Sequence, residues 1–317
     1  MTELSATPNQ AAAPCALCLA VRRVISAVSP VLLIIGFIIA IWYVACIPMN
    51  RAWIENRAGE RQELSELVPA VWQQVNPVLP SPHQVWVEFR ITVFEQPIMR
   101  ERRGEMQGNP RNLLFHAYQT LLPTLLGFVI GSGLGIALAI GILHNRAMDL
   151  SVMPWAIASQ MVPILAIAPM IIVVFNAIGI TGLLPKALIS SYLSFFPVVV
   201  GMVKGLRSPQ VMDLDLMHTY SATAPQVLWK LRLPAALPFL FASLKVGVAA
   251  SLVGAIVAEL PTGARFGLGA RLLSGSYYTD TPLLWSALIM AAICAASLVG
   301  TLGLIERLVL KRAGARP

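Results

Sequence analysis

Charged residues are scarce in this sequence. Only 12% of its 317 residues are Asp, Glu, Lys or Arg, whereas 57% are hydrophobic. A soluble domain averages about 25% charged and about 45–50% apolar residues. The formal net charge of +8 is accounted for by basic loops on the cytoplasmic side of a membrane protein, so it indicates no nucleic-acid partner. The composition predicts a polytopic membrane protein.

Cysteine is almost as rare. Cys15 and Cys18 form one C-x-x-C near the N-terminus with no second pair, and Cys46 and Cys294 lie in apolar runs. This number and spacing support neither a disulfide framework nor a metal site.

Residues that would mark an enzyme are also missing from the expected places. His116, His144 and His218 lie in or beside loops, and no cluster of His, Asp or Glu is expected at membrane depth. The Gly-rich run 131–135 lies within an apolar span rather than between a strand and a helix, and no Walker lysine accompanies it. We therefore expect no catalytic residue, no metal ligand and no cofactor in this chain.

Long apolar runs predict an all-α protein with six transmembrane helices, since each run is long enough for a hydrocarbon core about 30 Å thick. The runs are Val31 to Ile47, Leu121 to Leu143, about 152–175, Ala187 to Val203, Pro238 to Ala258 and Leu283 to Ile305. The predicted domains are a cytoplasmic segment 1–28, a first uncleaved span 29–49, a periplasmic connection 50–118, a core 119–310 with five spans, and a cytoplasmic tail 311–317.

Lys and Arg residues predict the orientation, because they are enriched in cytoplasmic loops. With both termini inside, the short outer connections hold only Lys186, Arg265 and Arg271. The inner side holds Arg22, Arg23, Arg146, Lys204, Arg207, Lys230, Arg232, Arg307, Lys311, Arg312 and Arg316. The sequence thus predicts a multi-pass protein of the inner membrane, surrounded by lipid, with residues 215–234 in the cytoplasm.

Two features of the outer and spanning regions carry further expectations. Residues 83–98 are expected as a surface helix, and the charge cluster 100–105 as a solvated loop, with an anion-binding patch as the alternative. Gly127, Gly131 and Gly135 recur every four residues, a spacing that lets helices approach closely in lipid.

Proline distinguishes the third span. Pro154, Pro163 and Pro169 predict one kinked helix over about 152–175, followed by a turn at 179–182. Proline frees backbone carbonyls, which is tolerated only against protein or a water-filled cavity. Met161, Pro163 and Pro169 are therefore candidates for the wall of a translocation pathway, and a purely structural kink is an equal alternative.

Two charges near the fifth span are also candidates for function, because ionisable residues in a membrane are costly. Lys245 lies about two turns into that span, where it would make an interfacial or coupling-helix contact or face the pathway. Glu259 closes the span at its outer end, where a lid or binding-protein contact and a simple helix-end charge are both open.

Residues 215–238 separate the fourth and fifth spans and contain two Leu-Pro pairs, at Leu233-Pro234 and Leu237-Pro238. Because proline disfavours a helix interior, the pairs predict a short helix, a stop and a new helix at the membrane surface. The upstream mixture of polar and apolar residues is typical of a short helix that lies on a membrane or in a partner protein.

The same residues resemble the cytoplasmic EAA loop of bacterial ABC importer permeases: Glu-Ala-Ala, three residues, Gly, nine residues, Ile, one residue, Leu-Pro. Here the pattern begins at Asp215 and places Ser221 at the Gly, Leu231 at the Ile, and Leu233-Pro234 at its end. The two alanines and the Gly are replaced.

Further segments resemble the branch of these permeases that imports nitrate, taurine, alkanesulfonates and pyrimidine-type precursors. In chain order they are Leu79 to Pro82, Pro163 to Pro169, Phe195 to Gly201, Ala242 to Gly247, Val257 to Glu259, Gly267 to Gly269, and Glu306-Arg307.

The resemblance implies a transmembrane subunit that works as a homodimer, with two cytoplasmic ATPase subunits that carry ATP and Mg and a periplasmic binding protein that delivers a small solute. It places a coupling helix near Ser221 to Leu231, with Met217, Tyr220, Val227 and Trp229 as apolar anchors in an ATPase groove. The permease itself would catalyse nothing. An ion-coupled secondary transporter is the alternative; it would show inverted repeats and paired broken helices.

Overall fold

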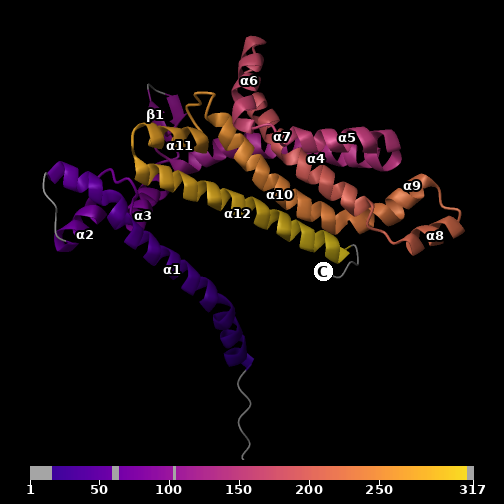
Figure 1. The fold of residues 1–317 in the computed structure, drawn as a ribbon, viewed down its shortest axis with the longest axis horizontal. Helices are drawn as coiled ribbons and strands as arrows, with labels where there is room; N and C mark the ends of the chain where they lie inside the picture. Colours follow the sequence, from indigo (N-terminus) through magenta and orange to yellow (C-terminus); the bar gives the residue numbers. More distant parts are fainter. Residues whose placement is uncertain (1–15, 59–63, 103–104, 313–317) are drawn as a thin grey trace, which may run out of the picture. The chain divides into compact units, whose positions relative to one another are not determined.

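The computed structural model describes residues 16–58, 64–102 and 105–312. The described chain is helical apart from one short pair of strands (Figure 1), which confirms the predicted fold class. It divides into two compact units, residues 1–84 and residues 85–317, which are described separately below. The start of the expected N-terminal segment and the end of the expected tail lie outside the described residues.

Unit 1 consists of α1 (Ala16–Ala58) and α2 (Leu64–Gln73). The spanning part of α1 is Ser29–Asn56, which extends beyond the expected 29–49. Buried Asn50 organises the segment that follows α2: its amide donates to the carbonyl of Leu79 at 2.8 Å, and its oxygen accepts from the N–H of Val78 at 2.6 Å. The indole of Trp42 donates to the carbonyl of Pro80. Residues 78–80 are therefore held against α1.

Unit 2 begins within α3 (Pro82–Arg90) and continues into η1, a π-helix at Ile91–Glu95. The next segment corrects the sequence prediction: β1 (Met99–Arg102) and β2 (Glu105–Gly108) form an antiparallel hairpin where a solvated loop was expected. Arg100 pairs with Gln107, and Glu101 with Met106. The ladder satisfies backbone groups that a loop would leave to water, so charged side chains do not prevent pairing here.

The membrane-spanning helices of unit 2 are α4 (Leu113–His144), α7 (Leu183–Leu206), α10 (Leu233–Glu259) and α12 (Thr281–Arg312). Between α4 and α7 lie α5 (Arg146–Ser159) and α6 (Ile164–Ala177), bent by 97°. In the described residues, five helices of the two units are long and apolar enough to cross a membrane, or six if the bent pair is one span. The count matches the expected six spans only if the bent pair is the third span, and the single kinked helix expected over about 152–175 is instead two helices.

Small residues let α4, α7 and α10 pack closely. A Cβ on Gly127 would lie 2.5 Å from the Ala187 carbonyl oxygen, and one on Gly131 would lie 2.2 Å from the Ser194 hydroxyl. Gly135 meets α7 in the same way. The predicted glycine stripe is therefore a helix interface. Buried Ser251 adds a polar bridge, donating to the Thr124 carbonyl at 2.7 Å.

The fourth and fifth spans are joined by α8 (Val211–Thr219), α9 (Ala224–Val227) and η2 (Leu228–Arg232, a π-helix). The helix stop expected at the Leu-Pro pairs is wrong, because α9, η2 and α10 continue into one another over Ala224–Glu259. The Leu233 N–H bonds back to Leu228 across the π turn. Pro234 then falls in the first turn of α10, directly after this π turn.

The two ends of unit 2 differ. Figure 1 shows α8, α9 and the end of α12 at one end, and β1 and α11 (Leu268–Tyr277) at the other. The basic residues Lys230, Arg232, Lys311 and Arg312 belong to the first end. We call the end with α8 and α9 the hairpin end, after the helical connection between α7 and α10, and the end with β1 and α11 the α11 end.

Candidate functional site

The connection between α7 and α10 is the first candidate site, and we call residues 208–232 the connecting hairpin. Its two short helices begin at reciprocal side-chain caps. At the start of α9, the Gln226 amide oxygen accepts from the Thr223 N–H at 2.8 Å, and at the start of α8 Asp213 accepts from Gln210. Such capping boxes define helix starts without tertiary contacts. The local sequence therefore specifies a helix–turn–helix shape.

Ser221 forms the turn between these helices. Its φ is +50°, a left-handed conformation that favours glycine because a Cβ is strained there. The N–H groups of Ser221 and Ala222 bond back to His218 and Met217. The coupling helix expected over 221–231 is therefore wrong at its start, since Ser221 to Thr223 are a turn. Ser221 nevertheless stands where the EAA pattern has Gly, and its backbone has a conformation suited to Gly.

This conformation makes a direct prediction. Ser221→Gly should relieve about 1 kcal/mol of strain and slow hydrogen exchange of the turn amides in the purified protein. Ala222→Gly is the matched control: its φ is not positive, so glycine there should speed exchange through added backbone freedom. Faster exchange in Ser221→Gly would contradict the assigned turn.

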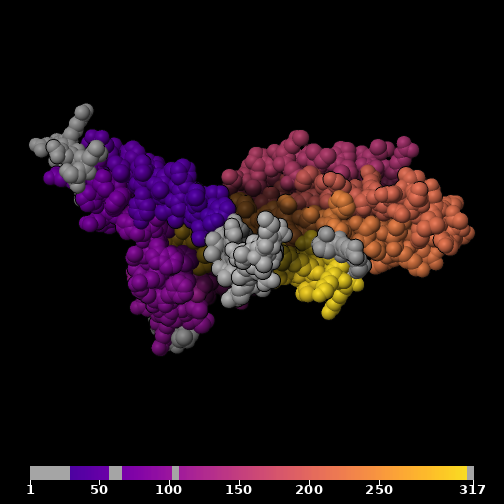
Figure 2. All heavy atoms as spheres, turned by 90° about the horizontal axis from the view of Figure 1, so that it is seen from below, coloured from indigo at the N-terminus to yellow at the C-terminus, as the bar shows by residue number. Residues whose placement is uncertain are grey.

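Large apolar side chains on the connecting hairpin point away from the protein. The exposed fractions are 74% for Val211, 78% for Met212, 56% for Leu216, 76% for Tyr220 and 70% for Trp229. Tyr220 and Trp229 are predicted anchors; Met217 and Val227 are half-buried. Figure 2 shows the orange surface of the connecting hairpin at one end of unit 2. Exposed apolar patches mark sites of protein or membrane contact.

Three of these residues were not predicted from sequence. Val211, Met212 and Leu216 belong to α8, which begins before the EAA-like pattern starts at Asp215. The capping pair Gln210 and Asp213 is the signal that could have located this earlier helix.

The base of the connecting hairpin is fixed to the spanning helices. Leu228 is buried with Leu206 and Ala236. The Arg232 guanidinium donates to the Leu206 carbonyl at 3.0 Å. A salt bridge of 2.9 Å between Arg207 and Asp149 holds the end of α7 to α5. The exposed apolar side chains therefore lie on a segment that is anchored to the spanning helices, as a docking surface requires.

The bent pair α5–α6 carries the candidate pathway residues. The bend lies at Gln160 to Pro163, and Pro163 occupies the N-cap of α6 with φ −63°. Tyr192 of α7 donates a hydrogen bond to the Ser159 carbonyl beside the bend. Met161, Pro163 and Pro169 are exposed in the single chain. Their pathway role stays a prediction.

Lys245 has a defined partner. Its ammonium forms a half-buried ion pair with Glu306 of α12, which joins α10 to α12. A charge in a spanning segment is tolerated when it is paired, so the pair accounts for the position of Lys245. Neither of the two expected roles is decided by it.

Glu259 ends α10 as expected, but it is not an exposed charge. It is fully buried, so it does not present its carboxylate to a lid or a partner in this structure. Its oxygens accept from the Thr120 hydroxyl at 2.9 Å and the Gly269 N–H at 2.7 Å. The same Thr120 oxygen accepts from the Leu268 N–H at 2.8 Å. The carboxylate therefore locks α4, α10 and the start of α11 together.

His116 completes this buried network. Its Nδ1 lies 3.0 Å from the Gly267 nitrogen and 2.9 Å from the Gly267 carbonyl oxygen, and its Nε2 lies 3.1 Å from the Pro110 carbonyl oxygen. Both nitrogens are engaged in holding backbone. Within the part of the chain that the structure describes, no group of three His, Cys, Asp or Glu residues could hold a metal ion.

Together, the spans and the exposed connecting hairpin define a class of protein: a helical membrane component that is built to work with partners. Residues 131–314 match the family described as the binding-protein-dependent transport system inner membrane component. The match covers more than half of the chain, and the chain belongs to this family.

Curated relatives agree with this family. The riboflavin transport system permease protein RibX of Chloroflexus aurantiacus is 33% identical over 196 residues, 62% of this chain and 71% of the relative. The formylaminopyrimidine transport permease protein ThiX of Halalkalibacterium halodurans is 31% identical over 154 residues, 49% and 60%. The taurine transport system permease protein TauC of Escherichia coli is 26% identical over 227 residues, 71% and 77%.

These findings confirm the resemblance found in the sequence. The chain is an ABC importer permease of the branch named there, and a multi-pass protein of the bacterial inner membrane. Membership implies ATPase and binding-protein partners in one transporter.

Proposed function

We propose that this chain forms, as a homodimer, the translocation pathway for a small solute that a periplasmic binding protein delivers. The relatives are named for riboflavin, formylaminopyrimidine, aliphatic sulfonates and taurine. A taurine-like or other sulfonate-type solute is our first assignment, nitrate is a further small anion, and a pyrimidine-type compound is the second. The chain would bind no ATP and need no cofactor; ATP and Mg would belong to two cytoplasmic ATPase subunits, which alone would hydrolyse it.

The exposed connecting hairpin carries this proposal. Short helices bind a groove through apolar side chains on one face, and Tyr220 and Trp229 are aromatic residues of the kind that dominate such contacts. Basic residues at the hairpin end support a cytoplasmic location of that end and of both termini, where ATPase subunits could reach it.

The EAA-like pattern would serve as the frame of this docking surface. Asp215 lies in α8, Ser221 forms the turn, and Leu231, Leu233 and Pro234 continue into α10. The left-handed Ser221 supports the alignment. Met217 and Val227, half-buried here, would contribute less contact area than the two aromatic side chains.

Pathway assignments remain part of the proposal. Met161, Pro163 and Pro169 would line the pathway at the bend, where a second copy and lipid would cover the exposed apolar surface. Lys245 would contact the solute beside Glu306, and Glu259 would contact it beside Thr120 and Gly269. The buried hydrogen bonds of Glu259 would have to open before its carboxylate could meet the solute.

The test is reconstitution in lipid vesicles of the chain with the ATPase and binding protein encoded beside it. ATP hydrolysis should rise several-fold only when the binding protein carries its ligand, and uptake should require ATP. Uptake driven by an ion gradient in vesicles that contain the chain alone would overturn the proposal and favour a secondary transporter.

A further inference from the structure

A second feature lies at the α11 end, away from the connecting hairpin. There a cavity of about 480 Å³ opens between segments that are far apart in sequence. Volumes of about 300–1,000 Å³ are usual for small-molecule sites. The cavity is lined by Glu88, Ile91, Thr92, Gln96, Arg111, Arg271, Ser274, Tyr278, Asp280 and Leu283.

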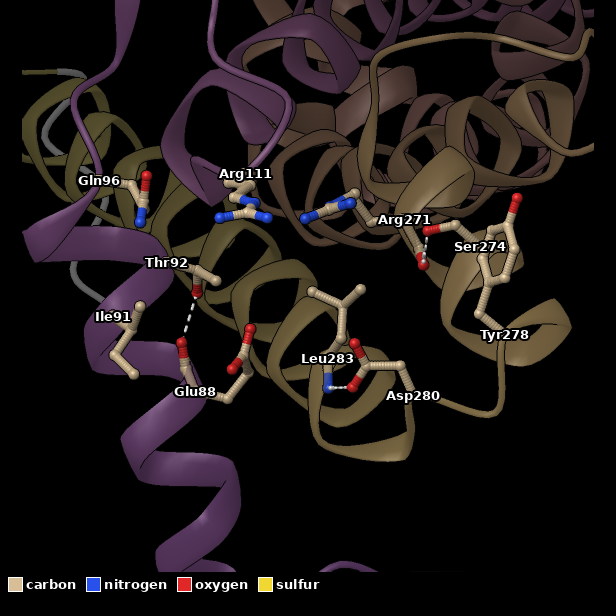
Figure 3. A pocket seen from close by; sticks show the side chains of 10 residues that line it. All are labelled: Glu88, Ile91, Thr92, Gln96, Arg111, Arg271, Ser274, Tyr278, Asp280 and Leu283. Carbon is tan, nitrogen blue, oxygen red and sulfur yellow. Dashed lines mark hydrogen bonds between the residues drawn. The ribbon is translucent and has the colours of Figure 1, made fainter. Parts of the chain in front are cut away.

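The charges in this cavity are sorted by sign. Figure 3 shows the guanidinium groups of Arg111 and Arg271 turned toward each other, with the carboxylates of Glu88 and Asp280 on another side of the cavity. Two like charges that face each other are unfavourable unless an opposite charge lies between them. The cavity therefore has one cationic and one anionic part.

These four charges do not neutralise each other by contact. Within the described residues of unit 2, none of them forms an ion pair within 4.0 Å. The buried Nε of Arg271 has no hydrogen-bond partner there either. An unpaired buried donor costs about 1–3 kcal/mol, so the arrangement suits a ligand that supplies an acceptor.

Electrostatics give the same division. Burial, and then the nearby Asp280, raises the pKa of Glu88 above its usual value. Burial also lowers the pKa of Arg271; the nearby Glu88 and Asp280 oppose this effect, and Arg111 adds to it. Burial is thus the main cost for both groups, the opposite charges offset it in part, and a molecule with both signs would supply a partner for each.

The other side chains suit a small molecule. Ile91 and Leu283 offer apolar contact for a short carbon chain, while Thr92 and Gln96 offer polar groups. The walls are set by the fold: Asp280 accepts from the Leu283 N–H at 3.2 Å and so caps α12, and Arg271 lies two residues beyond Gly269, which the buried Glu259 holds.

We propose that this cavity binds a small zwitterion, with the anionic group between Arg111 and Arg271 and the cationic group beside Glu88 and Asp280. The site is a receiving position on the outer side of the permease. Binding at this cavity does not depend on the proposed import function. That the bound molecule is the transported solute does depend on it. An anion alone would leave the two carboxylates repelling each other, so a dipolar solute is preferred over nitrate.

The first experiment uses the purified full chain in lipid nanodiscs, in a buffer free of zwitterions. The probes are 2-aminoethanesulfonate, ethanesulfonate and ethylamine, which carry both charges, only the anion and only the cation. We expect 2-aminoethanesulfonate to raise the melting temperature, and the two half-probes to need at least about tenfold higher concentration for the same shift.

The variants keep the walls in place. Glu88→Gln preserves size, Asp280→Asn keeps a side-chain oxygen that can cap α12, and Arg271→Lys keeps the charge but loses the forked donor. Each should weaken 2-aminoethanesulfonate binding about tenfold or more. Arg90→Gln is the matched control on α3, because Arg90 pairs with Glu95 and does not line the cavity; its binding should stay unchanged.

Each outcome decides between explanations. Equal binding of ethanesulfonate, unaffected by Glu88→Gln, would show a simple anion site and overturn the inference. Variants that release the binding protein but bind 2-aminoethanesulfonate normally would show a docking surface instead, and would also overturn it. No ligand shift, in a complex whose ATPase still responds to loaded binding protein, would refute the zwitterion site alone. Binding without any uptake of 2-aminoethanesulfonate would refute transit of that solute through this site.

Discussion

Trp229→Asp in the connecting hairpin should separate the permease from its ATPase subunits. A hot-spot aromatic contributes about 2 kcal/mol or more to an interface, which weakens binding about 30-fold, and a buried carboxylate adds to the loss. Trp229 is largely exposed in the single chain, so the variant should fold and insert normally. The measurement is co-purification of the ATPase with the permease, followed by ATP-driven uptake.

The matched control is Tyr277→Asp. Tyr277 is also a largely exposed aromatic residue, but it lies at the end of α11, at the opposite end of unit 2. The ATPase should remain bound to this variant. If the ATPase stays with a permease in which residues 215–234 are scrambled, the connecting hairpin is not its docking surface.

Gly267→Ala should destabilise the α11 end strongly. Gly267 has φ +134°, and a Cβ there would lie 2.3 Å from the Glu259 carboxyl carbon. The added methyl must displace the carboxylate that accepts from Thr120 and Gly269. We expect a loss of about 3 kcal/mol or more, as for other disrupted buried networks, measured as a lower melting temperature of the purified chain.

Gly263→Ala separates the backbone effect from the clash. Gly263 also has a positive φ, +58°, but a Cβ there meets nothing within 4 Å. Its cost should be only the left-handed strain of about 1–2 kcal/mol. Equal destabilisation by the two substitutions would show that the Glu259 network contributes little.

The sequence predicted those features that depend on local pattern. Apolar runs located the spans, and three prolines predicted a kink in the third, where the structure has a 97° bend between two helices. The EAA-like spacing singled out Ser221 as the residue at the Gly position. Its left-handed backbone conformation could not be predicted from composition. The family followed from motifs of the same local kind and is confirmed by the match over residues 131–314.

Features that depend on tertiary contact were missed or wrong. Leu-Pro pairs normally end helices, but the π turn before Pro234 lets the helix continue. In the sequence Glu259 resembles a surface charge at a helix end. Its burial depends on a hydrogen bond from Thr120, which is distant in sequence. The cavity at the α11 end joins Glu88, Arg111 and Asp280, and no sequence spacing brings these together.

The uninterrupted helix from Ala224 to Glu259 has a mechanical consequence. Its 36 residues extend about 50 Å at a rise of 1.5 Å per residue, so one continuous helix runs from near Trp229 at the hairpin end to Glu259 at the α11 end. A tilt imposed at one tip would swing the other tip by leverage, without any relay of side-chain rearrangements between them. Arg271 lies two residues beyond Gly269, which Glu259 holds, so it would move with that end of the helix, and a movement imposed by the ATPase subunits would widen or narrow the cavity at the α11 end directly.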